Sequence, residues 1–317
     1  MLRKKLISIV SPCYNEEENI QIHLDRVIKS IEPLMDKYDF EHVYTDNRST
    51  DKTFEILEAI ASEKKNLRVI RFSNNIGYNR SIFMGLMHAK GDAVMLIQSD
   101  LQDPPELIPQ FINEWESGHD VVYGKILDRD ENYILKNMRR LFYYLIDAFA
   151  EVSVPRNAGD FRLMSRRSLD ALLKHREDDP FSRVVIARIG FSQKAIPFER
   201  HARLRGQTNF RFFHLLNYAI NSFVTTTVAP IRIVSALGLL FAVIGFLLTL
   251  AIVIAKLAYP EFAPRGLAAT MSLITFFSGM QLLGIGIVGE YLRKTYLQSL
   301  NRPLGFIDRS VNLDEET

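Results

Sequence analysis

Short apolar segments alternate with amphipathic segments along the first part of the chain, up to about residue 125. Between the apolar runs, apolar residues recur at helical spacing, as Ile20, Leu24, Val27 and Ile31 do. Strands that alternate with helices are typical of a mostly parallel, doubly wound, Rossmann-like α/β sheet. The apolar runs predict strands at residues 6–10, 42–46, 67–72, 93–97, 120–124 and, farther along, 158–165.

Two helices are expected from other signals. Asn15 and Glu18 have the spacing of a capping box, which predicts that the first helix begins there. Residues 210–229 mix aromatic and polar side chains at helical spacing. That pattern predicts an amphipathic helix, which either lies on a membrane surface or packs against the soluble domain.

Charged residues are common up to residue 211 and then almost vanish. Between Arg232 and Lys256 lie 23 consecutive uncharged residues, and 24 lie between Arg265 and Glu290. Each run exceeds the roughly 20 apolar residues that cross a bilayer core. The sequence therefore predicts two transmembrane helices. Cations outside the runs place both chain ends in the cytoplasm, although the linker cations Lys256 and Arg265 count against this orientation.

Four segments follow from these patterns. They are an α/β domain (1–209), an amphipathic helix (210–229), a two-helix transmembrane hairpin (230–290) and a cytoplasmic C-terminal tail (291–317). The net charge of +2 gives no reason to expect nucleic-acid binding. The single cysteine, Cys13, excludes a disulfide within the chain. A G-x-G-x-x-G pattern at residues 284–289 lies inside the second apolar run, where small residues favour close helix packing and permit homo-oligomers.

An acidic loop follows the expected strand 93–97. Asp100, Gln102 and Asp103 offer the oxygen ligands that a divalent cation on a diphosphate requires. An acidic helix start, with Asp103 as a cap, would explain the loop equally well. Ligands of doubly wound sheets bind at the carboxyl ends of the strands, and Asp46 and residues 14–16 also fall there. These additional strand ends favour a binding site.

Four motifs carry a family resemblance: PCYNE at 12–16, DNRSTD at 46–51, DLQDPPE at 100–106 and GDFRLM at 159–164. Their order resembles the family-2 glycosyltransferases of GT-A fold. More narrowly, it resembles the polyprenyl-phosphate branch, which includes dolichol-phosphate mannose synthase and bacterial undecaprenyl-phosphate glucosyltransferases. The resemblance covers nearly the whole chain.

The resemblance implies an inverting hexosyltransferase of the bacterial inner membrane. It would move a sugar from a nucleotide-sugar donor, expected to be a UDP-sugar, to undecaprenyl phosphate at the cytoplasmic face, for cell-envelope glycan biosynthesis. Asp100 and Gln102 would hold Mg²⁺ or Mn²⁺ on the diphosphate. Asp100, Asp160 and Arg162 would be catalytic. The nucleotide sugar would contact Pro12, Tyr14, Glu16, Asp46, Ser99 and Asp100.

The chemistry of the acceptor favours arginines over a strong base. A phosphate monoester has a second pKa of about 6, so it is largely dianionic at pH 7 and attacks without first losing a proton. Positioning and charge neutralisation should then dominate catalysis. Arginine suits this role because its planar fork grips phosphate at two points. The candidates are Arg129, Arg162 and Arg205.

The chain departs from the family pattern at charged positions. Thr45 replaces the first of two usual aspartates, and Gln98-Ser99-Asp100 replaces D-x-D. Tyr78 stands where a lysine is usual, and the segment 206–209 also lacks its lysine. A single carboxylate predicts weaker metal binding unless the carbonyls of Gln98 and Gln102 compensate.

Two other functions are consistent with the sequence. A transferase of the same fold could extend a lipid-linked saccharide through a hydroxyl acceptor, with Asp160 as the base. Alternatively, the departures could mark a catalytically silent membrane scaffold.

Overall fold

The structure is a computed structural model that describes residues 3–127, 158–174, 186–187, 189–200, 229–258, 266–300 and 302–313. Contacts divide the chain into two compact units. The first unit combines Met1–Tyr143, Val152–Phe212 and Asn301–Thr317. The second combines Tyr144–Glu151 and Phe213–Leu300. The predicted amphipathic helix lies outside the described residues, apart from its final position.

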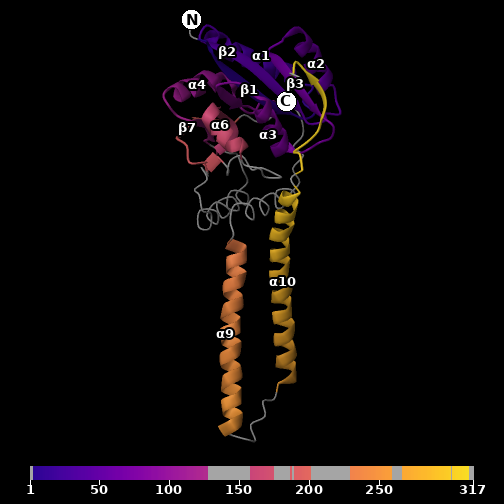
Figure 1. The fold of residues 1–317 in the computed structure, drawn as a ribbon, viewed down its shortest axis with the longest axis vertical. Coiled ribbons are helices and arrows are strands. Elements are labelled where there is room, and N and C mark those ends of the chain that lie inside the picture. Colours follow the sequence, from indigo (N-terminus) through magenta and orange to yellow (C-terminus); the bar gives the residue numbers. More distant parts are fainter. Residues whose placement is uncertain are drawn as a thin grey trace. The chain divides into compact units, whose positions relative to one another are not determined.

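The first unit is built on an eight-stranded sheet (Figure 1). The six strands predicted from apolar runs are all present, although their ends differ by a few residues. In chain order the strands are β1 (Lys5–Cys13), β2 (Tyr38–Asp46), β3 (Leu67–Phe72), β4 (Ala93–Leu96), β5 (Val121–Ile126), β6 (Ala158–Ser165), β7 (Gln193–Phe198) and β8 (Ile307–Val311).

The sheet is mostly parallel, as predicted. Its spatial order is β7-β5-β6-β4-β1-β2-β3-β8. Parallel pairing joins β4, β1, β2 and β3, and also joins β5 to β7. The strand β6 runs antiparallel to both β4 and β5, and β8 runs antiparallel to β3. The carboxyl ends of β4, β1 and β2 therefore meet at one edge.

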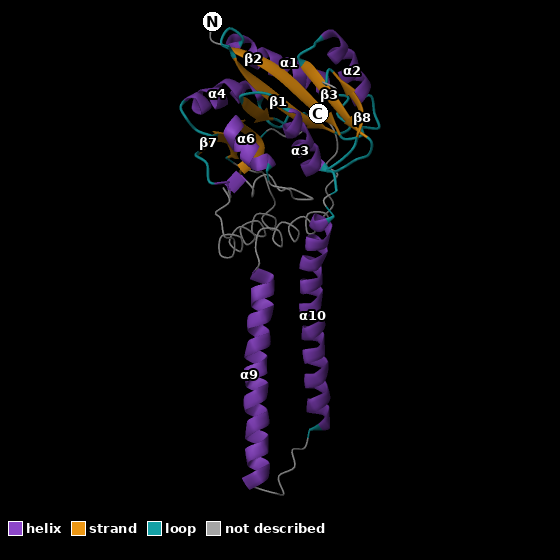
Figure 2. Cartoon of the chain, in the orientation of Figure 1, coloured by secondary structure: helices purple, strands orange, loops and turns teal. Residues whose placement is uncertain are grey.

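Helices cover both faces of the sheet, which explains why its central strands are apolar on both sides (Figure 2). The helices α1 and α4 pack with one apolar cluster, α3 and α6 with a second, and α1 and α2 with a third. In the first unit the helices are α1 (Ile20–Ile31), α2 (Thr53–Glu63), α3 (Tyr78–His88), α4 (Ile108–Glu116) and α6 (Arg166–Leu173).

The predicted capping box is wrong. The helix α1 begins at Ile20, several residues after Asn15, and no side chain caps it. Asn15 instead has a left-handed backbone (φ 55°), and its Oδ1 accepts a hydrogen bond of 2.8 Å from the Thr50 N–H. Its side chain thus joins the loop after β1 to the loop after β2.

The C-terminal segment contributes a strand that the sequence analysis missed. The strand β8 pairs with β3, so that Val311 lies opposite Val69. Directly after it, the side-chain Nδ2 of Asn312 donates to the carbonyls of Ala61 (2.7 Å), Lys64 (3.2 Å) and Leu67 (2.8 Å). Asn312 therefore satisfies two carbonyls at the end of α2, where helices leave such groups unpaired, and one at the start of β3.

Two long helices, α9 (Ala229–Ala258) and α10 (Leu267–Ser299), form the described part of the second unit. The rings of Phe241 and Phe277 pack edge to face at 5.3 Å between centroids. A Cβ on Gly284 would lie 3.1 Å from Val234, whereas one on Gly286 or Gly289 would meet none of the described residues within 4 Å. Of these three glycines, only Gly284 has the predicted close contact. Within the part of the chain that the structure describes, no helix is both long and apolar enough to cross a membrane.

Replacing Asn312 should destabilise the first unit. Asn312→Gly removes three hydrogen bonds but tolerates the left-handed backbone (φ 57°), and we expect a loss of roughly 1–2 kcal/mol. Asn312→Ala adds backbone strain of about 1 kcal/mol. Urea unfolding of the full-length protein measures both values. Equal stability of the glycine variant and the wild type would contradict a stabilising role for these bonds.

His23 should make the protein sensitive to acid. Burial lowers the pKa of His23 from 6.5 to about 3. Between those pH values the unfolded chain binds a proton that the folded chain excludes. The free energy of unfolding should then fall by about 1.4 kcal/mol per pH unit as the pH drops. His23→Gln should reduce this slope in urea unfolding between pH 7 and pH 4, whereas His119→Gln, at a half-exposed position, serves as the control. An unchanged slope would contradict the assignment.

Candidate active site

The residues singled out at strand ends meet at one edge of the sheet. Cys13 is paired with Asp46 across β1 and β2, and Leu96 with Arg162 across β4 and β6. The Ser99 hydroxyl, just after β4, donates to the carbonyl of Pro12 on β1 (2.9 Å). The topology therefore brings together the ends of β1, β2 and β4 with the middle of β6.

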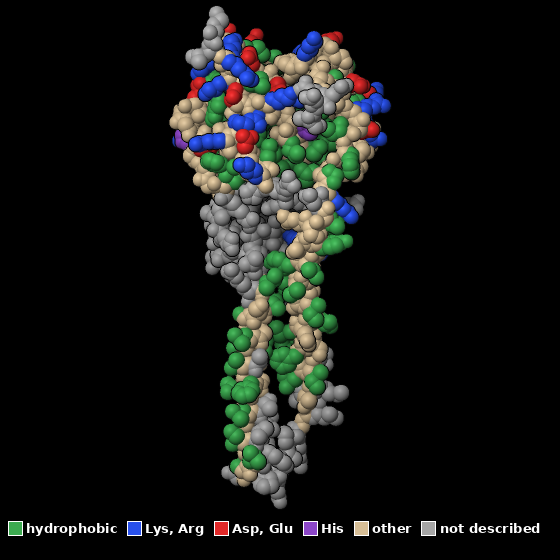
Figure 3. Space-filling model, in the orientation of Figure 1, with side chains coloured by type: hydrophobic (Ala, Val, Ile, Leu, Met, Phe, Trp, Pro, Cys, Tyr) green, Lys and Arg blue, Asp and Glu red, His purple; other side chains and the backbone are tan. Residues whose placement is uncertain are grey.

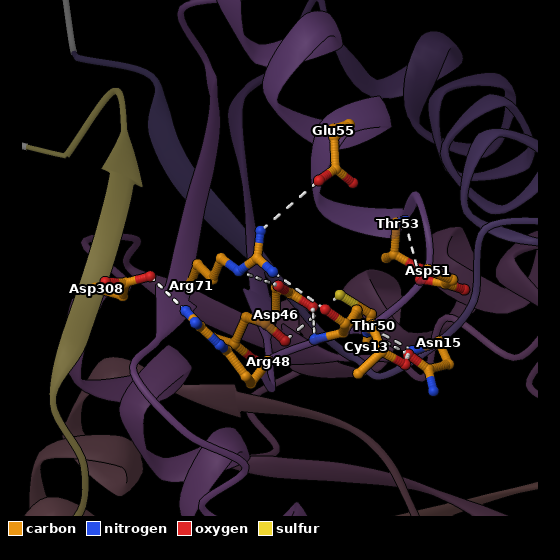
Figure 4. Close-up of polar contacts among 12 residues, drawn as sticks. Cys13, Asn15, Asp46, Arg48, Thr50, Asp51, Thr53, Glu55, Arg71 and Asp308 are labelled. Carbon is orange, nitrogen blue, oxygen red and sulfur yellow. Dashed lines mark hydrogen bonds and ion pairs between the residues drawn. The ribbon is translucent and has the colours of Figure 1, made fainter.

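Asp46 is the centre of a buried polar cluster beside this edge (Figure 4). Its Oδ1 accepts a hydrogen bond from the Ser49 N–H (3.1 Å), and its Oδ2 lies 3.4 Å from Nε of Arg71. Burial raises the pKa of Asp46, while the Ser49 hydrogen bonds and the Arg71 charge oppose the shift. Arg71 also lies over the ring of Phe54, 4.5 Å from its centroid. This carboxylate is fixed in place before any ligand arrives.

The other predicted nucleotide contacts differ in accessibility. Tyr14 is 41% exposed, so its ring is open to a ligand. Glu16 accepts a hydrogen bond from Nδ2 of Asn19 (2.6 Å), and its backbone N–H donates to the Thr53 hydroxyl (2.8 Å). The roles of Pro12, Tyr14, Glu16, Asp46 and Ser99 stay predictions.

Three buried carboxylates lie near one another beyond β4. Asp100, Asp103 and Asp160 are each at most 6% exposed. The pKa of Asp103 rises to about 7, chiefly because of burial, although the Arg200 charge lowers it; Asp100 and Asp160 add repulsion. The Oδ2 of Asp103 has no hydrogen-bond partner within the described residues. Negative charge is therefore concentrated here, and a cationic group would reduce the repulsion among the three carboxylates.

Asp160 and Arg162 lie together on β6. Nη2 of Arg162 is 3.5 Å from Oδ1 of Asp160 and donates to the carbonyl of Gly159 at 2.7 Å. Arg162 is only 3% exposed. The arginine therefore holds the Asp160 carboxylate in this structure, and its assignment to the acceptor phosphate stays a prediction.

The donor set suits a hard cation with few protein ligands. Asp100 is buried, and its Oδ1 accepts from the Gln102 N–H (3.1 Å). The Oδ2 of Asp103, in the same acidic loop, has no hydrogen-bond partner among the residues that the structure describes. Gln98 does not replace the missing aspartate, because its Oε1 accepts from Arg200 (3.1 Å) and its Nε2 donates to Tyr78 (2.5 Å). No three His, Cys, Asp or Glu side chains of the described residues converge on one point. The arrangement fits Mg²⁺ or Mn²⁺ completed by water and phosphate oxygens.

Some predicted residues lie outside the described part of the chain, namely Arg129, Arg205 and the segment 206–209. From the sequence, Asp103 is a possible cation ligand beside Asp100 and Gln102, but the predicted metal site contains only the latter two. Arg200 is not among the predicted site residues. Nothing in the sequence marks Arg200, which reaches the site only through the pairing of β7 with β5.

Known proteins resemble this chain over almost its whole length. It is 33% identical over 304 residues to the prophage bactoprenol glucosyl transferase homolog of Escherichia coli (strain K12), with 96% of this chain and 98% of the relative covered. It is 34% identical over 298 residues to the bactoprenol glucosyl transferase of Shigella phage SfV, with 94% and 96% covered.

A mannosyltransferase of Pyrobaculum calidifontis, solved with GDP-Man and Mn²⁺, aligns with a TM-score of 0.48 at 17% identity, covering 94% of this chain and 87% of that one.

The fold and the relatives define a glycosyltransferase. Residues 8–173 match the family described as Glycosyl transferase family 2. The chain belongs to this family. The resemblance seen in the four motifs is thereby confirmed at the level of family and enzyme class.

Two ion pairs in Figure 4 should differ in their effect on stability. Arg71→Met leaves the fully buried Asp46 without its cation, and we expect a loss of roughly 3 kcal/mol. Arg48→Met breaks a pair with Asp308 in which both side chains are about 40% or more exposed, and we expect less than about 1 kcal/mol. Urea unfolding of both variants makes the comparison. Equal losses would contradict the buried pair's special role.

Proposed function

We propose that this protein is an inverting glycosyltransferase that moves a sugar from a nucleotide-sugar donor, by preference a UDP-sugar, to polyprenyl phosphate. One observation carries the proposal: buried carboxylates and Arg162 gather at the carboxyl edge of the sheet, where ligands of such sheets bind. Relatives named as bactoprenol glucosyl transferases, similar over nearly the full length, support a polyprenyl acceptor.

The charges of the site fit the requirements of this reaction. The leaving group is a nucleoside diphosphate, and a Mg²⁺ or Mn²⁺ ion held by Asp100 and Gln102 would supply Lewis-acid stabilisation of its charge. Tyr14, Glu16, Asp46 and Ser99 would bind and orient the nucleotide. Asp160 would lie beside the reacting sugar, and Arg162 would share its charge between Asp160 and an arriving phosphate.

The acceptor decides how much base catalysis is needed. A phosphate monoester is largely dianionic at pH 7, because its second pKa is about 6. It attacks the anomeric carbon with an existing negative charge, so Asp160 need not remove a proton. Arg162, together with Arg129 and Arg205, would neutralise the acceptor phosphate while the sugar is transferred.

We infer further that residues 233–255 and 266–289 anchor the enzyme in the bacterial inner membrane, with the catalytic unit in the cytoplasm. Both runs are uncharged in the complete sequence, and each is longer than the roughly 20 residues that cross a bilayer core. Figure 3 shows apolar side chains along much of both helices, whereas Lys, Arg, Asp and Glu side chains are scattered over the drawn face of the first unit. Examples are Phe246 (68% exposed), Leu257 (79%) and Leu282 (69%). Apolar side chains exposed in this way are favoured in contact with lipid acyl chains.

Asp160→Asn should abolish transfer while the protein still folds, because the substitution keeps the shape and removes the charge. We expect a fall of about a hundredfold or more in the rate of sugar transfer. The assay incubates full-length protein in detergent with labelled nucleotide sugars, Mn²⁺ and undecaprenyl phosphate, and scores a lipid product that mild acid cleaves. Asp170→Asn, at an exposed position on α6, is the matched control.

The same assay separates the other functions. A product formed only on a hydroxyl acceptor would replace the proposal with saccharide extension. Absence of turnover with every donor, together with unchanged cellular glycan in an Asp100→Ala strain, would favour a silent scaffold.

A further inference from the structure

Four side chains from four elements form a continuous polar chain that ends on Asp160. Arg200, just after β7, donates from Nη2 to Oε1 of Gln98 (3.1 Å). Gln98, just after β4, donates from Nε2 to the hydroxyl of Tyr78, the first residue of α3 (2.5 Å). The Tyr78 hydroxyl donates to Oδ2 of Asp160 on β6 (3.2 Å).

Donor and acceptor chemistry gives this chain one direction. A guanidinium only donates, so the Gln98 oxygen must face Arg200, and the Gln98 amide nitrogen must then face Tyr78. The phenol oxygen accepts that bond, which leaves its single proton for the carboxylate. Each bond polarises the next in the same sense, so the Arg200 charge strengthens the hydrogen bond from Tyr78 to Asp160.

Asp160 is held on both sides. Tyr78 meets its Oδ2, and Nη2 of Arg162 lies 3.5 Å from its Oδ1. Arg162 is buried and tied to the carbonyl of Gly159, so β6 itself fixes that side. Tyr78 is 42% exposed, and it follows Gly77, whose left-handed backbone (φ 89°) turns the chain into α3. Of the two groups that hold Asp160, the Tyr78 phenol is therefore the solvent-exposed one.

We propose that Tyr78 is a positioning residue for the transfer reaction, which holds the Asp160 carboxylate in its reactive orientation, and that Gln98 and Arg200 hold Tyr78. The inference rests on the proposed function. It also gives Gln98 a purpose other than cation binding, because both ends of its amide are used within the chain.

Tyr78→Phe tests the proposal, because it removes one hydroxyl and leaves the ring. We expect kcat to fall about tenfold or more, since the reacting carboxylate loses its orientation. The donor KM should change by less than about threefold, because the nucleotide is bound elsewhere. Tyr38→Phe is the control, since Tyr38 begins β2 at the opposite edge of the sheet and its hydroxyl contacts Glu116.

Gln98→Glu distinguishes positioning from general support of the fold. A carboxylate at this position keeps a partner for Arg200 but cannot donate to the phenol, which would then turn its proton away from Asp160. We expect Gln98→Glu to lower kcat by about as much as Tyr78→Phe, and the double variant to be no worse than either one. If the double variant lost the product of the two single-variant reductions in kcat, Gln98 would not act through Tyr78, and this part of the proposal would be overturned.

A kcat of Tyr78→Phe within about twofold of an active wild type would overturn the proposal. If the wild type transfers no sugar to any lipid phosphate, the proposed function fails instead. Crystal structures of the wild type and Tyr78→Phe then decide this inference separately. An Asp160 side chain that keeps its torsion angles and order in the variant would refute positioning, and a changed or disordered one would support it.

Discussion

The main constraint on this site is the electrostatic repulsion among carboxylates that lie at one edge of the sheet. The partners of each carboxylate reduce this repulsion. The strand order β6-β4-β1-β2 places Asp160 and Asp46 on strands of the same part of the sheet, with Asp100 and Asp103 in the loop after β4. The chain balances each charge differently. Asp46 has Arg71 and a backbone N–H, Asp160 has a phenol and an arginine, and the pKa of Asp103 is raised until it competes for a proton.

These differences in pairing fit the phosphate chemistry of the proposed function. A carboxylate that is already paired is rigid, so it would orient a substrate with little further loss of entropy. A carboxylate whose charge is poorly compensated, such as Asp103, would gain most if a cation entered with a diphosphate. In the proposed reaction, the fixed acids would therefore orient the substrate, and Asp103 would favour the entry of the cation.

The central sheet could be predicted because both faces of its strands are buried, which forces continuous apolar runs such as residues 93–97. The acidic loop after β4 was predictable for a related reason, since a strand end in such a sheet is where ligands bind. The strand β8 could not be predicted in this way. It is an exposed edge strand with the sequence IDRSV, and only its distant partner β3 makes it a strand.

Side-chain pairing across the fold was equally hidden. Asn15 looks like a helix cap by spacing, yet its partner is Thr50, which the fold brings close from another loop. Tyr78 and Gln98 looked like separate losses of charge, whereas they are hydrogen-bonded to each other. Local patterns predict elements, but such pairs depend on topology, which one sequence does not specify.

After α10 the chain returns to the first unit, and this limits where the protein can be truncated. The helical pair is an insertion within the first unit, whose final strand comes from residues beyond Leu300. A soluble fragment cut before α9 would lack β8 and leave the backbone edge of β3 open. Unprotected edges invite pairing between molecules. A chain that lacks only the helices would still contain β8, the partner of β3.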